Sequence, residues 1–127
     1  MTTIPDSHRD LLNGQVAVLG TNGASGRPQL SAVWFLAEGD TVRISLNTVR
    51  QKVKNLQANP KVSLLILADP PYRYIELRGD AEITPDDDYE FADKLGAKYG
   101  ADLRTRDNPG DKRVVVTIHP TRVVTWG

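Results

Sequence analysis

The sequence predicts a mainly β protein with short helices, folded as a small antiparallel barrel. Six or so segments have the length and composition of strands, most of them joined by turns rich in Gly, Pro, Asn and Asp. Only three short stretches carry helix signals, and short strand connections favour antiparallel pairing. The 127 residues, 39% of them hydrophobic, fit one domain over residues 1–127.

The first half of the chain predicts a short helix and three strands. Asp or Ser can cap a helix over residues 6–12, which Asn13-Gly14 ends. The β-branched segment 15–21 and the segment 28–36 flank an Asn-Gly turn, so we expect a hairpin. Residues 41–46 alternate with period two, which places Val42, Ile44 and Leu46 on one face.

The second half predicts the remaining strands. Residues 61–67 are almost continuously apolar, which indicates a strand covered on both faces. Residues 72–83 alternate until Gly79, where a bulge or bend is expected. Residues 113–118 and 121–126 form either one last strand or a pair interrupted at Pro120.

A short helix is also predicted after the third strand. Thr48 is a good N-cap, and the helix ends before Pro60. An apolar stripe at helical spacing is expected to be buried: Val49, Val53 and Leu56.

The start of this helix has an unusual charge. Its first turns carry Arg50, Lys52 and Lys54 without an acid, although the N-terminal end of a helix already has positive potential. By contrast, the helix expected over residues 85–99 begins with Thr84, a proline and three aspartates, as an ordinary helix start does. The basic start is either a solvated face or a site for a phosphate or carboxylate. In such a site, Lys52 and Arg50 are expected to bracket the anion from both sides.

The positive charge is local. Residues 41–68 contain five basic residues and no acid, whereas the chain as a whole has 16 basic and 16 acidic residues. Zero net charge argues against general attraction to nucleic acid, and no aromatic side chain is interleaved with the cations between Phe35 and Tyr72. No apolar run is long enough to span a bilayer, so we expect no membrane partner and a cytoplasmic location.

Several classes of chemistry lack their residues. There is no cysteine, and His8 and His119 are far apart, so we expect no metal site and no thiol chemistry. No dinucleotide or P-loop motif is present, and no set of nucleophile, base and orienting group is evident. The three aspartates at residues 86–88 are explained by their position at a helix start, without a catalytic role. A protein with a phosphate grip but no catalytic groups is best suited to hold a phosphorylated cofactor.

The order of these motifs resembles a known family. The hairpin strand from Gly26 to Ser31, the segment 45–48, Arg-x-Lys-x-x-Asn at 50–55 and Asn59-Pro60-Lys61-Val62-Ser63 are similar to the split-barrel flavoproteins related to pyridoxamine 5'-phosphate oxidase. The chain most resembles their actinobacterial branch, which depends on coenzyme F420. The resemblance implies a six-stranded antiparallel split β-barrel of the FMN-binding type. It also implies a homodimer with two cofactor sites across its interface.

The resemblance also implies roles for individual residues. Arg50 and Lys52 correspond to ligands of the cofactor phosphate, assisted by Asn55 and the backbone near Thr48. Positions expected to face the ring system are Gln29, Ser31, Ala32, Ser45, Leu46 and Asn47. Positions expected in a substrate pocket are Tyr72, Tyr74 and Trp34. The chain is much shorter than the true pyridoxamine 5'-phosphate oxidases, which puts vitamin B6 activity in doubt.

Three functions remain open. The first is an oxidoreductase in which reduced F420 gives a hydride to a small organic substrate. The second is an FMN-dependent oxidase or reductase that uses the same phosphate grip. The third is a barrel that stores or carries a cofactor without catalysis. The residues do not separate a flavin from a deazaflavin.

Overall fold

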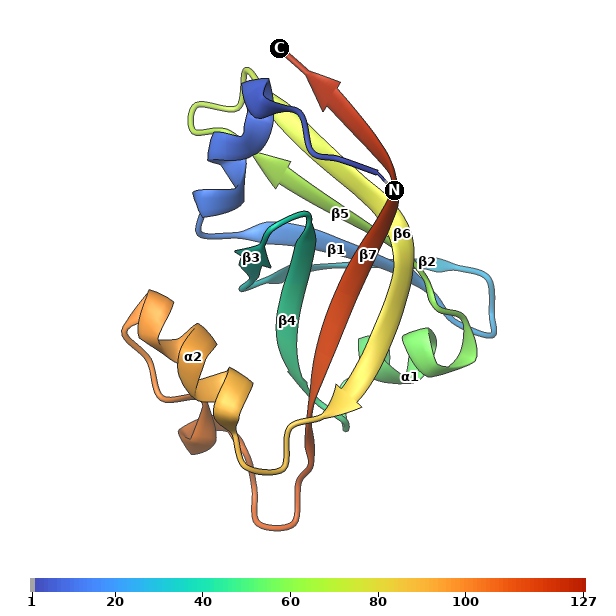
Figure 1. Ribbon diagram of the computed structural model, residues 1–127. Coiled ribbons are helices and arrows are strands. Elements are labelled where there is room, and N and C mark those ends of the chain that lie inside the picture. Colours follow the sequence, from blue (N-terminus) through green and yellow to red (C-terminus); the bar gives the residue numbers. More distant parts are fainter. Residues whose placement is uncertain (1) are drawn as a thin grey trace.

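The computed structural model describes residues 2–127, and Met1, the first residue of the predicted domain, lies outside the described residues. The chain forms one antiparallel sheet in the order β2-β1-β5-β6-β7-β4-β3 (Figure 1). The strands are β1 (Ala17–Asn22), β2 (Pro28–Val33), β3 (Leu36–Glu38), β4 (Thr41–Asn47), β5 (Lys61–Leu67), β6 (Tyr74–Pro85) and β7 (Arg113–Trp126). The α-helices are α1 (Gln51–Ala58) and α2 (Glu90–Tyr99), and the 3-10 helices are η1 (Asp6–Asn13) and η2 (Leu103–Arg106).

The predicted mainly β fold with short helices is confirmed, but the predicted number of six strands is wrong, and the sheet is not closed into a barrel. The sheet has seven strands, and β2 and β3 are its two edges. The predicted strand 28–36 is divided at Trp34 and Phe35: β2 pairs with β1, whereas β3 pairs with β4 at the opposite edge. One chain segment therefore connects both edges of the curved sheet.

Side chains of α2 satisfy the backbone where this segment crosses. The Phe35 N–H donates to the Tyr99 hydroxyl at 3.0 Å. The Phe35 carbonyl accepts from Lys98 Nζ at 2.8 Å and from the Tyr99 hydroxyl at 3.2 Å. A buried backbone group without a partner is costly, so these contacts let the chain leave the sheet without losing stability.

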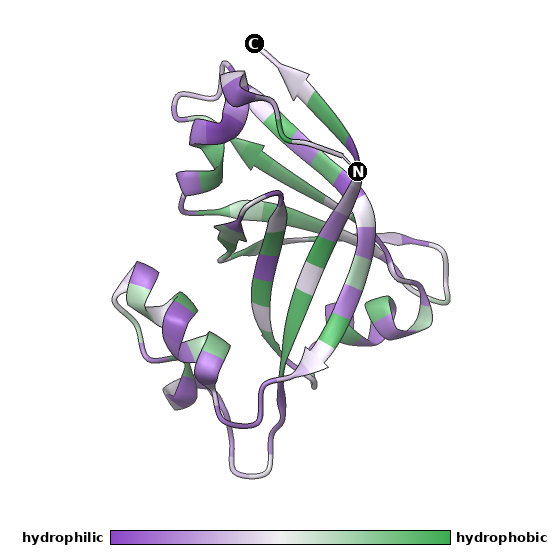
Figure 2. Cartoon of the chain, viewed as in Figure 1, coloured by the Kyte–Doolittle hydropathy of each residue, from purple (hydrophilic) through white to green (hydrophobic). Residues whose placement is uncertain are grey.

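The core lies on the inner face of the curved sheet. Hydrophobic residues recur along its strands (Figure 2). The prediction for 41–46 is confirmed, because Val42, Ile44 and Leu46 are all buried. Within this protomer residues 61–67 are covered on one face only, so their cover on both faces stays a prediction. Their inward side chains are buried, but Leu65 is half-buried and Leu67 is exposed.

The last two strands form the longest pairing of the sheet. The expected bulge is confirmed, since the register of β6 with β7 shifts between Arg78 and Gly79. A Cβ on Gly79 would clash with the His119 carbonyl, so the close approach requires glycine. β7 runs unbroken through Pro120, whose missing N–H is tolerated at this irregularity.

The start of α2 differs from the prediction. β6 continues through Pro85, and the helix begins at Glu90 instead of residue 85. The Asp86 carboxylate accepts the N–H groups of Phe91 at 3.1 Å and Ala92 at 2.9 Å, so it caps the helix from a distance. None of the described helices is long and apolar enough to cross a membrane.

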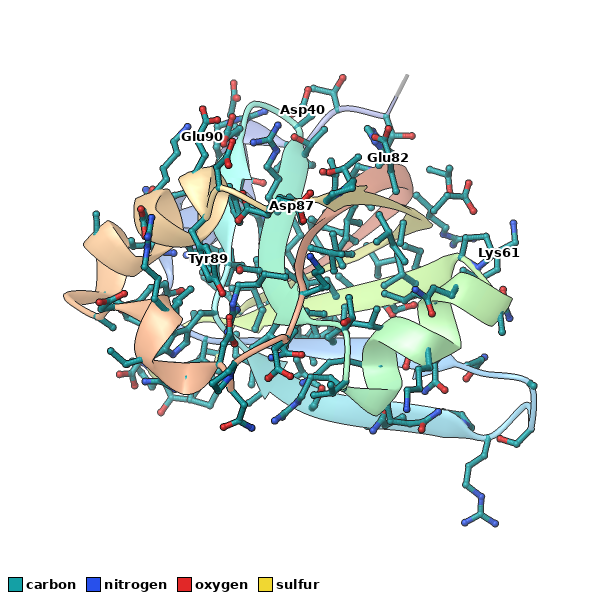
Figure 3. The ribbon with its side chains drawn as sticks, turned by 90° about the horizontal axis from the view of Figure 1, so that it is seen from below. Asp40, Lys61, Glu82, Asp87, Tyr89 and Glu90 are labelled. Atoms are coloured by element: carbon teal, nitrogen blue, oxygen red, sulfur yellow. The ribbon has the colours of Figure 1, made fainter. Side chains whose placement is uncertain are left out.

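The cap at Asp86 makes a prediction about stability. Asp86→Ala removes two hydrogen bonds from a buried position and is expected to cost about 1–2 kcal/mol in urea unfolding. Asp87→Ala is the matched control, because Asp87 is an exposed aspartate beside the same helix start (Figure 3). It is expected to change stability by less than about 0.5 kcal/mol. Equal losses in the two variants would contradict the cap.

Candidate functional site

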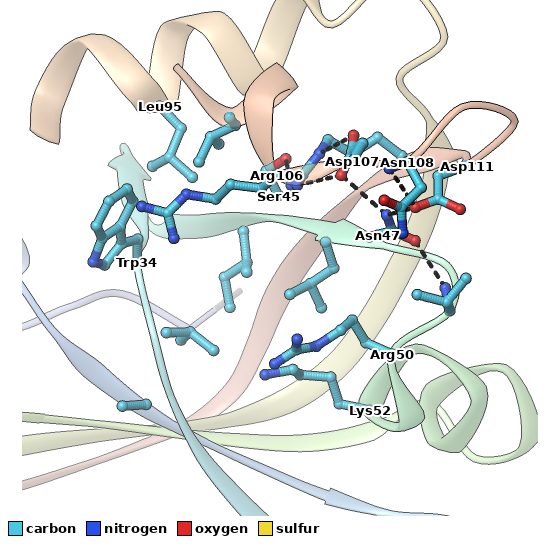
Figure 4. A pocket seen from close by; sticks show the side chains of 17 residues that line it. Trp34, Ser45, Asn47, Arg50, Lys52, Leu95, Arg106, Asp107, Asn108 and Asp111 are labelled. Carbon is cyan, nitrogen blue, oxygen red and sulfur yellow. Dashed lines mark hydrogen bonds and ion pairs between the residues drawn. The ribbon is translucent and has the colours of Figure 1, made fainter. Parts of the chain in front are cut away.

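A cavity of about 320 Å³ lies beside the pairing of β4 with β7. One wall comes from the chain around Ala32 to Trp34 and from β4. Arg50 and Lys52 line a second wall at the start of α1. The third wall is formed by η2 and the loop that leads from it to β7 (Figure 4). The cavity lies within the size range of small-molecule and cofactor sites.

Asn47 forms the turn that leads into α1. The prediction that Thr48 caps this helix is wrong, because α1 begins at Gln51 after a turn. Asn47 Oδ1 accepts the N–H of Val49 at 3.0 Å, and its carbonyl accepts the N–H of Arg50 at 3.0 Å. The Thr48 N–H donates to the carbonyl of Lys112 at 2.9 Å, which ties the turn to the start of β7.

The later start of α1 also changes its buried stripe. Val53 and Leu56 are buried as predicted, but Val49 is 59% exposed and borders the cavity. The first N–H groups of a helix have no acceptor within the helix. At the start of α1 these are the N–H groups of Gln51 and Lys52. The cavity therefore borders a helix start as well as its cations.

Lys52 is a buried cation that has no acidic partner among the described residues. The residue is 6% exposed, and its ammonium donates to Ser31 Oγ at 3.1 Å. Within residues 2–127, no carboxylate lies within 4 Å of Lys52 Nζ or of the Arg50 guanidinium. Burial, and then the charge of Arg50, lower the pKa of Lys52 below its ordinary value. An anion at this position would compensate both effects.

The expectation that the two cations bracket an anion from opposite sides is wrong. Figure 4 shows Arg50 and Lys52 extending next to one another into the cavity from the start of α1. Lys54 is exposed and does not line the cavity. Arg50 and Lys52 thus form one pair of adjacent cations on the same side of the cavity.

Asn55 and Gln29 hold α1 against the sheet. Asn55 Nδ2 donates to Thr21 Oγ1 at 3.1 Å and to Gln29 Oε1 at 3.0 Å, and Asn55 Oδ1 accepts from Gln51 at 2.9 Å. Neither Asn55 nor Gln29 lines the cavity. Their direct contact with a cofactor stays a prediction, while their role here is to position the helix that carries Lys52.

Four other predicted residues border the cavity directly: Ala32, Ser45, Leu46 and Asn47. Ser31 does not line it and reaches it through its hydrogen bond to Lys52. Strand alternation places Ser31 on the inner face of β2 and Ala32 on the outer face, so the cavity extends to the edge of this strand.

The predicted substrate-pocket residues do not lie together. Trp34 lines the cavity and stacks on Tyr99, with ring centroids 4.3 Å apart. Tyr72 is 78% exposed before β6, and Tyr74 pairs with Leu67 and Trp126 at the other end of β6 from the cavity. Neither tyrosine lines the cavity of its own protomer. Their predicted place in a partner's pocket stays a prediction.

A polar network on the third wall was missed by sequence reasoning. The Arg113 guanidinium makes two hydrogen bonds to Asp107, at 3.0 and 2.9 Å, and one to Ser45 Oγ at 3.1 Å. Asn47 Nδ2 donates to Asp107 at 3.0 Å and to Asp111 at 2.9 Å. This network joins the turn before α1 to the loop before β7.

The signal for this wall was present but ambiguous. Residues 102–113 contain seven charged side chains around Asn108-Pro109-Gly110, a stretch that also predicts an exposed turn. Only the pairing of Asn47 with Arg113 across β4 and β7 shows that this loop faces the cavity.

The network predicts a pH-dependent contribution to stability. Burial alone would raise the pKa of Asp107, but hydrogen bonds from Arg113, Asn47 and Tyr89 outweigh it and lower the pKa. A carboxyl with a lowered pKa in the folded state stabilises the protein above its unfolded pKa of about 4, and this contribution is lost at lower pH. Asp107→Asn leaves Arg113 buried without its counterion and is expected to cost about 3 kcal/mol at pH 7.

Urea unfolding at pH 7 and pH 3 measures this difference, which is expected to shrink at pH 3. Asp111→Asn is the control, because Asp111 accepts from Asn47 and the Asn108 N–H but pairs with no cation within the described chain. Its loss is expected to be about 1 kcal/mol. A pH-independent loss in Asp107→Asn would refute the role of its charge.

Solved structures of other proteins are similar to this chain in both fold and sequence. A solved structure described as an F420 reductase is 36% identical, with a TM-score of 0.84, and the match covers 95% of this chain and 98% of that one. A conserved hypothetical protein from Mycobacterium tuberculosis is 25% identical, with a TM-score of 0.79, over 98% of this chain and 85% of that one. HupZ of Group A Streptococcus is 25% identical, with a TM-score of 0.74, over 97% of this chain and 94% of the other.

The family model described as pyridoxamine 5'-phosphate oxidase matches residues 4–127, almost the whole chain. The family predicted from the motifs around Arg50 and Lys52 is therefore confirmed, and the similarity to an F420 reductase agrees with the predicted branch. The chain belongs to the pyridoxamine 5'-phosphate oxidase family.

Proposed function

We propose that the protein is an oxidoreductase that binds coenzyme F420 in this cavity and uses it to reduce a small organic substrate. The observation that carries the proposal is the buried ammonium of Lys52, which has a hydroxyl but no carboxylate beside it in the described chain. The 36% identity to an F420 reductase supports the choice of cofactor.

The residues present fit a phosphorylated cofactor. Arg50 and Lys52 provide two cations, and the start of α1 adds backbone N–H groups, a combination that suits a phosphate group. The apolar side chains of Val33, Ile44 and Leu46 border the same cavity and suit a flat ring system. Reduced F420 supplies a hydride to an electron-poor carbon when it is bound.

The residues of the chain bind and orient, and none is assigned a chemical step. The carboxylates of the third wall are engaged by Arg113, Asn47 and Tyr89. They keep the wall in place without competing for the cations at the start of α1. This division suits a protein whose reactivity comes from its cofactor.

FMN is the alternative cofactor, because the phosphate of either molecule would meet Arg50 and Lys52. A barrel that binds a cofactor without catalysis is the second alternative. Mass spectrometry of the ligand released from purified protein separates FMN from F420. Turnover of reduced F420 with a panel of electron-poor substrates separates a reductase from a carrier. The cytoplasmic location also stays a prediction.

Removing the charge of Lys52 is expected to weaken cofactor binding. Lys52→Met keeps the volume of the buried side chain but removes its charge, and is expected to weaken F420 binding by roughly 1.5–3 kcal/mol, the usual range for a hydrogen bond to a charged group. Fluorescence quenching measures the affinity. Lys54→Met is the control, because Lys54 is an exposed lysine of the same helix that does not line the cavity. Equal effects of the two variants would show only general charge attraction.

The protein without cofactor is expected to tolerate the loss of the Lys52 charge. Because the pKa of Lys52 is lower in the folded state, its ammonium costs stability at neutral pH. That cost disappears as pH rises through the folded pKa toward the unfolded value of about 10.4. Lys52→Met is therefore expected to melt at or above the wild-type temperature at pH 7, with a difference that shrinks by pH 10. A variant destabilised at pH 7 would mean that Lys52 is a structural residue.

The protein is also proposed to act as a homodimer. Across β2, β1 and β5, the outward face carries Leu30, which is 71% exposed, and Leu67, which is 48% exposed. Val18 and Leu65 lie between them and are half-buried. An apolar sheet face of this kind is commonly covered by a second copy of the same chain.

Sedimentation at micromolar concentration tests the dimer. The wild type is expected to sediment as a dimer, and the double variant Leu30→Asp/Leu67→Asp as a folded monomer, because both side chains are exposed in the protomer. Gln57→Asp, at an exposed position on α1, is expected to stay dimeric. A wild type that sediments as a monomer would contradict the proposed dimer.

A further inference from the structure

Arg106 occupies a part of the cavity that the phosphate grip does not explain. It is the last residue of η2, and its guanidinium carbon lies 4.9 Å from the centre of the Trp34 ring. Trp34 in turn stacks on Tyr99 with nearly parallel rings. Figure 4 shows Arg106 and Trp34 on one side of the cavity, well separated from Arg50 and Lys52.

Arg106 differs from Arg104 and Arg113 in having no acid beside it within the described chain. Arg104, on the same short helix, makes two hydrogen bonds to Asp93, at 3.1 and 2.7 Å. Arg113 is paired with Asp107. Within residues 2–127, no carboxylate lies within 4 Å of the Arg106 guanidinium, although it lines the same cavity as two aspartates.

Those two aspartates are engaged elsewhere. Asp107 accepts from Arg113, Asn47 and the Tyr89 hydroxyl. Asp111 accepts from Asn47 Nδ2 and from the Asn108 N–H. Figure 4 shows both carboxylates on the side of Asn47, away from the end of the Arg106 side chain. The charge of Arg106 is thus left for a group that enters the cavity.

The contact with Trp34 prepares Arg106 for a planar anion. A guanidinium packed on an aromatic ring uses its face for that contact and keeps the N–H donors of its edge available. Its fork matches two oxygens of a carboxylate, and the fixed position reduces the entropy lost on binding. η2 is held by buried Leu103 and by the Asp102 side chain, which accepts the Arg104 N–H at 3.0 Å.

We propose that Arg106, held on Trp34, recognises a planar anionic oxygen group, a carboxylate or phenolate, on the side of the cavity away from Arg50 and Lys52. This inference rests on the proposed function, because it assigns Arg50 and Lys52 to the cofactor phosphate. A single phosphate then satisfies the grip at α1 and leaves Arg106 for a second anion. The substrate class that fits is a small organic acid with a flat apolar body, which the side chains of Leu95 and Leu103 border.

The same chemistry has two sources, an acidic substrate or an ionised oxygen of the cofactor itself. Benzoate and its neutral analogue benzamide are the probes, titrated into the cofactor-free protein and into the F420-saturated protein. The indole N–H resonance of Trp34 in NMR reports binding beside Arg106. The resonance of Trp126, at the opposite end of β7 from the cavity, is the internal control.

Benzoate is expected to shift the Trp34 resonance with at least about tenfold higher affinity than benzamide. Arg106→Gln is expected to abolish that preference while F420 affinity stays within about twofold. Arg104→Gln is the matched control, because it removes an arginine that is already paired with Asp93, and it is expected to keep the preference.

The outcomes separate the two sources. Loss of the benzoate preference in Arg106→Gln assigns the anion to a substrate, and a loss of F420 affinity of tenfold or more in that variant assigns it to the cofactor. If neither changes, the proposal is overturned. If the wild type binds neither F420 nor FMN, the proposed function fails, yet the titration of the cofactor-free protein still decides the role of Arg106.

Discussion

The ammonium of Lys52 is buried beside the Ser31 hydroxyl, and the features of the site follow from the need to keep it there. Removing a charge from water costs free energy unless a partner compensates it, and no acid within residues 2–127 lies close enough to do so. Val53 and Leu56, both buried, dock α1 on the core. The packing of the helix thus holds Lys52 in a position that its own electrostatics disfavour, an arrangement that is common at functional sites.

The sheet supplies the second constraint, because the pairing of β4 with β7 places Asn47 opposite Arg113. Asn47 ends the strand before α1, and Arg113 begins the strand after the loop. The Asn47 amide serves both sides, with its oxygen on the turn and its nitrogen on two carboxylates. The Asn47 side chain therefore links the wall that carries the aspartates to the wall that carries the cations, in addition to the backbone bond from Thr48 to Lys112.

Much of the fold could be predicted from the sequence because its signals are local. Period-two alternation located β4 and β6, and the apolar run 61–67 matched β5 to the residue. What failed depended on distant residues. The division of segment 28–36 into β2 and β3 requires Lys98 and Tyr99 to satisfy the backbone of Phe35. The start of α2 is fixed by the carboxylate of Asp86 after β6 continues through Pro85.

The candidate site likewise combines residues that local signals predicted with residues that they did not. Arg50 and Lys52 stood out because they break a local rule for helix starts, and the structure places both in the cavity. Arg106 and Asp107 follow no such rule, since a charged loop around Asn-Pro-Gly is indistinguishable in sequence from a solvated turn. Their position becomes visible only when β7 pairs with β4.

The distribution of charge around the cavity explains how one small protein can hold acids and cations together without neutralising them. The acids accept from Arg113, Asn47 and backbone or hydroxyl donors, so each carboxylate has partners of its own. Because opposite charges attract strongly where water is excluded, a carboxylate without these partners would be drawn toward the cations of the cavity. The hydrogen bonds of the third wall thus matter to the cations indirectly: by fixing Asp107 and Asp111, they preserve a positively charged space that a ligand can enter.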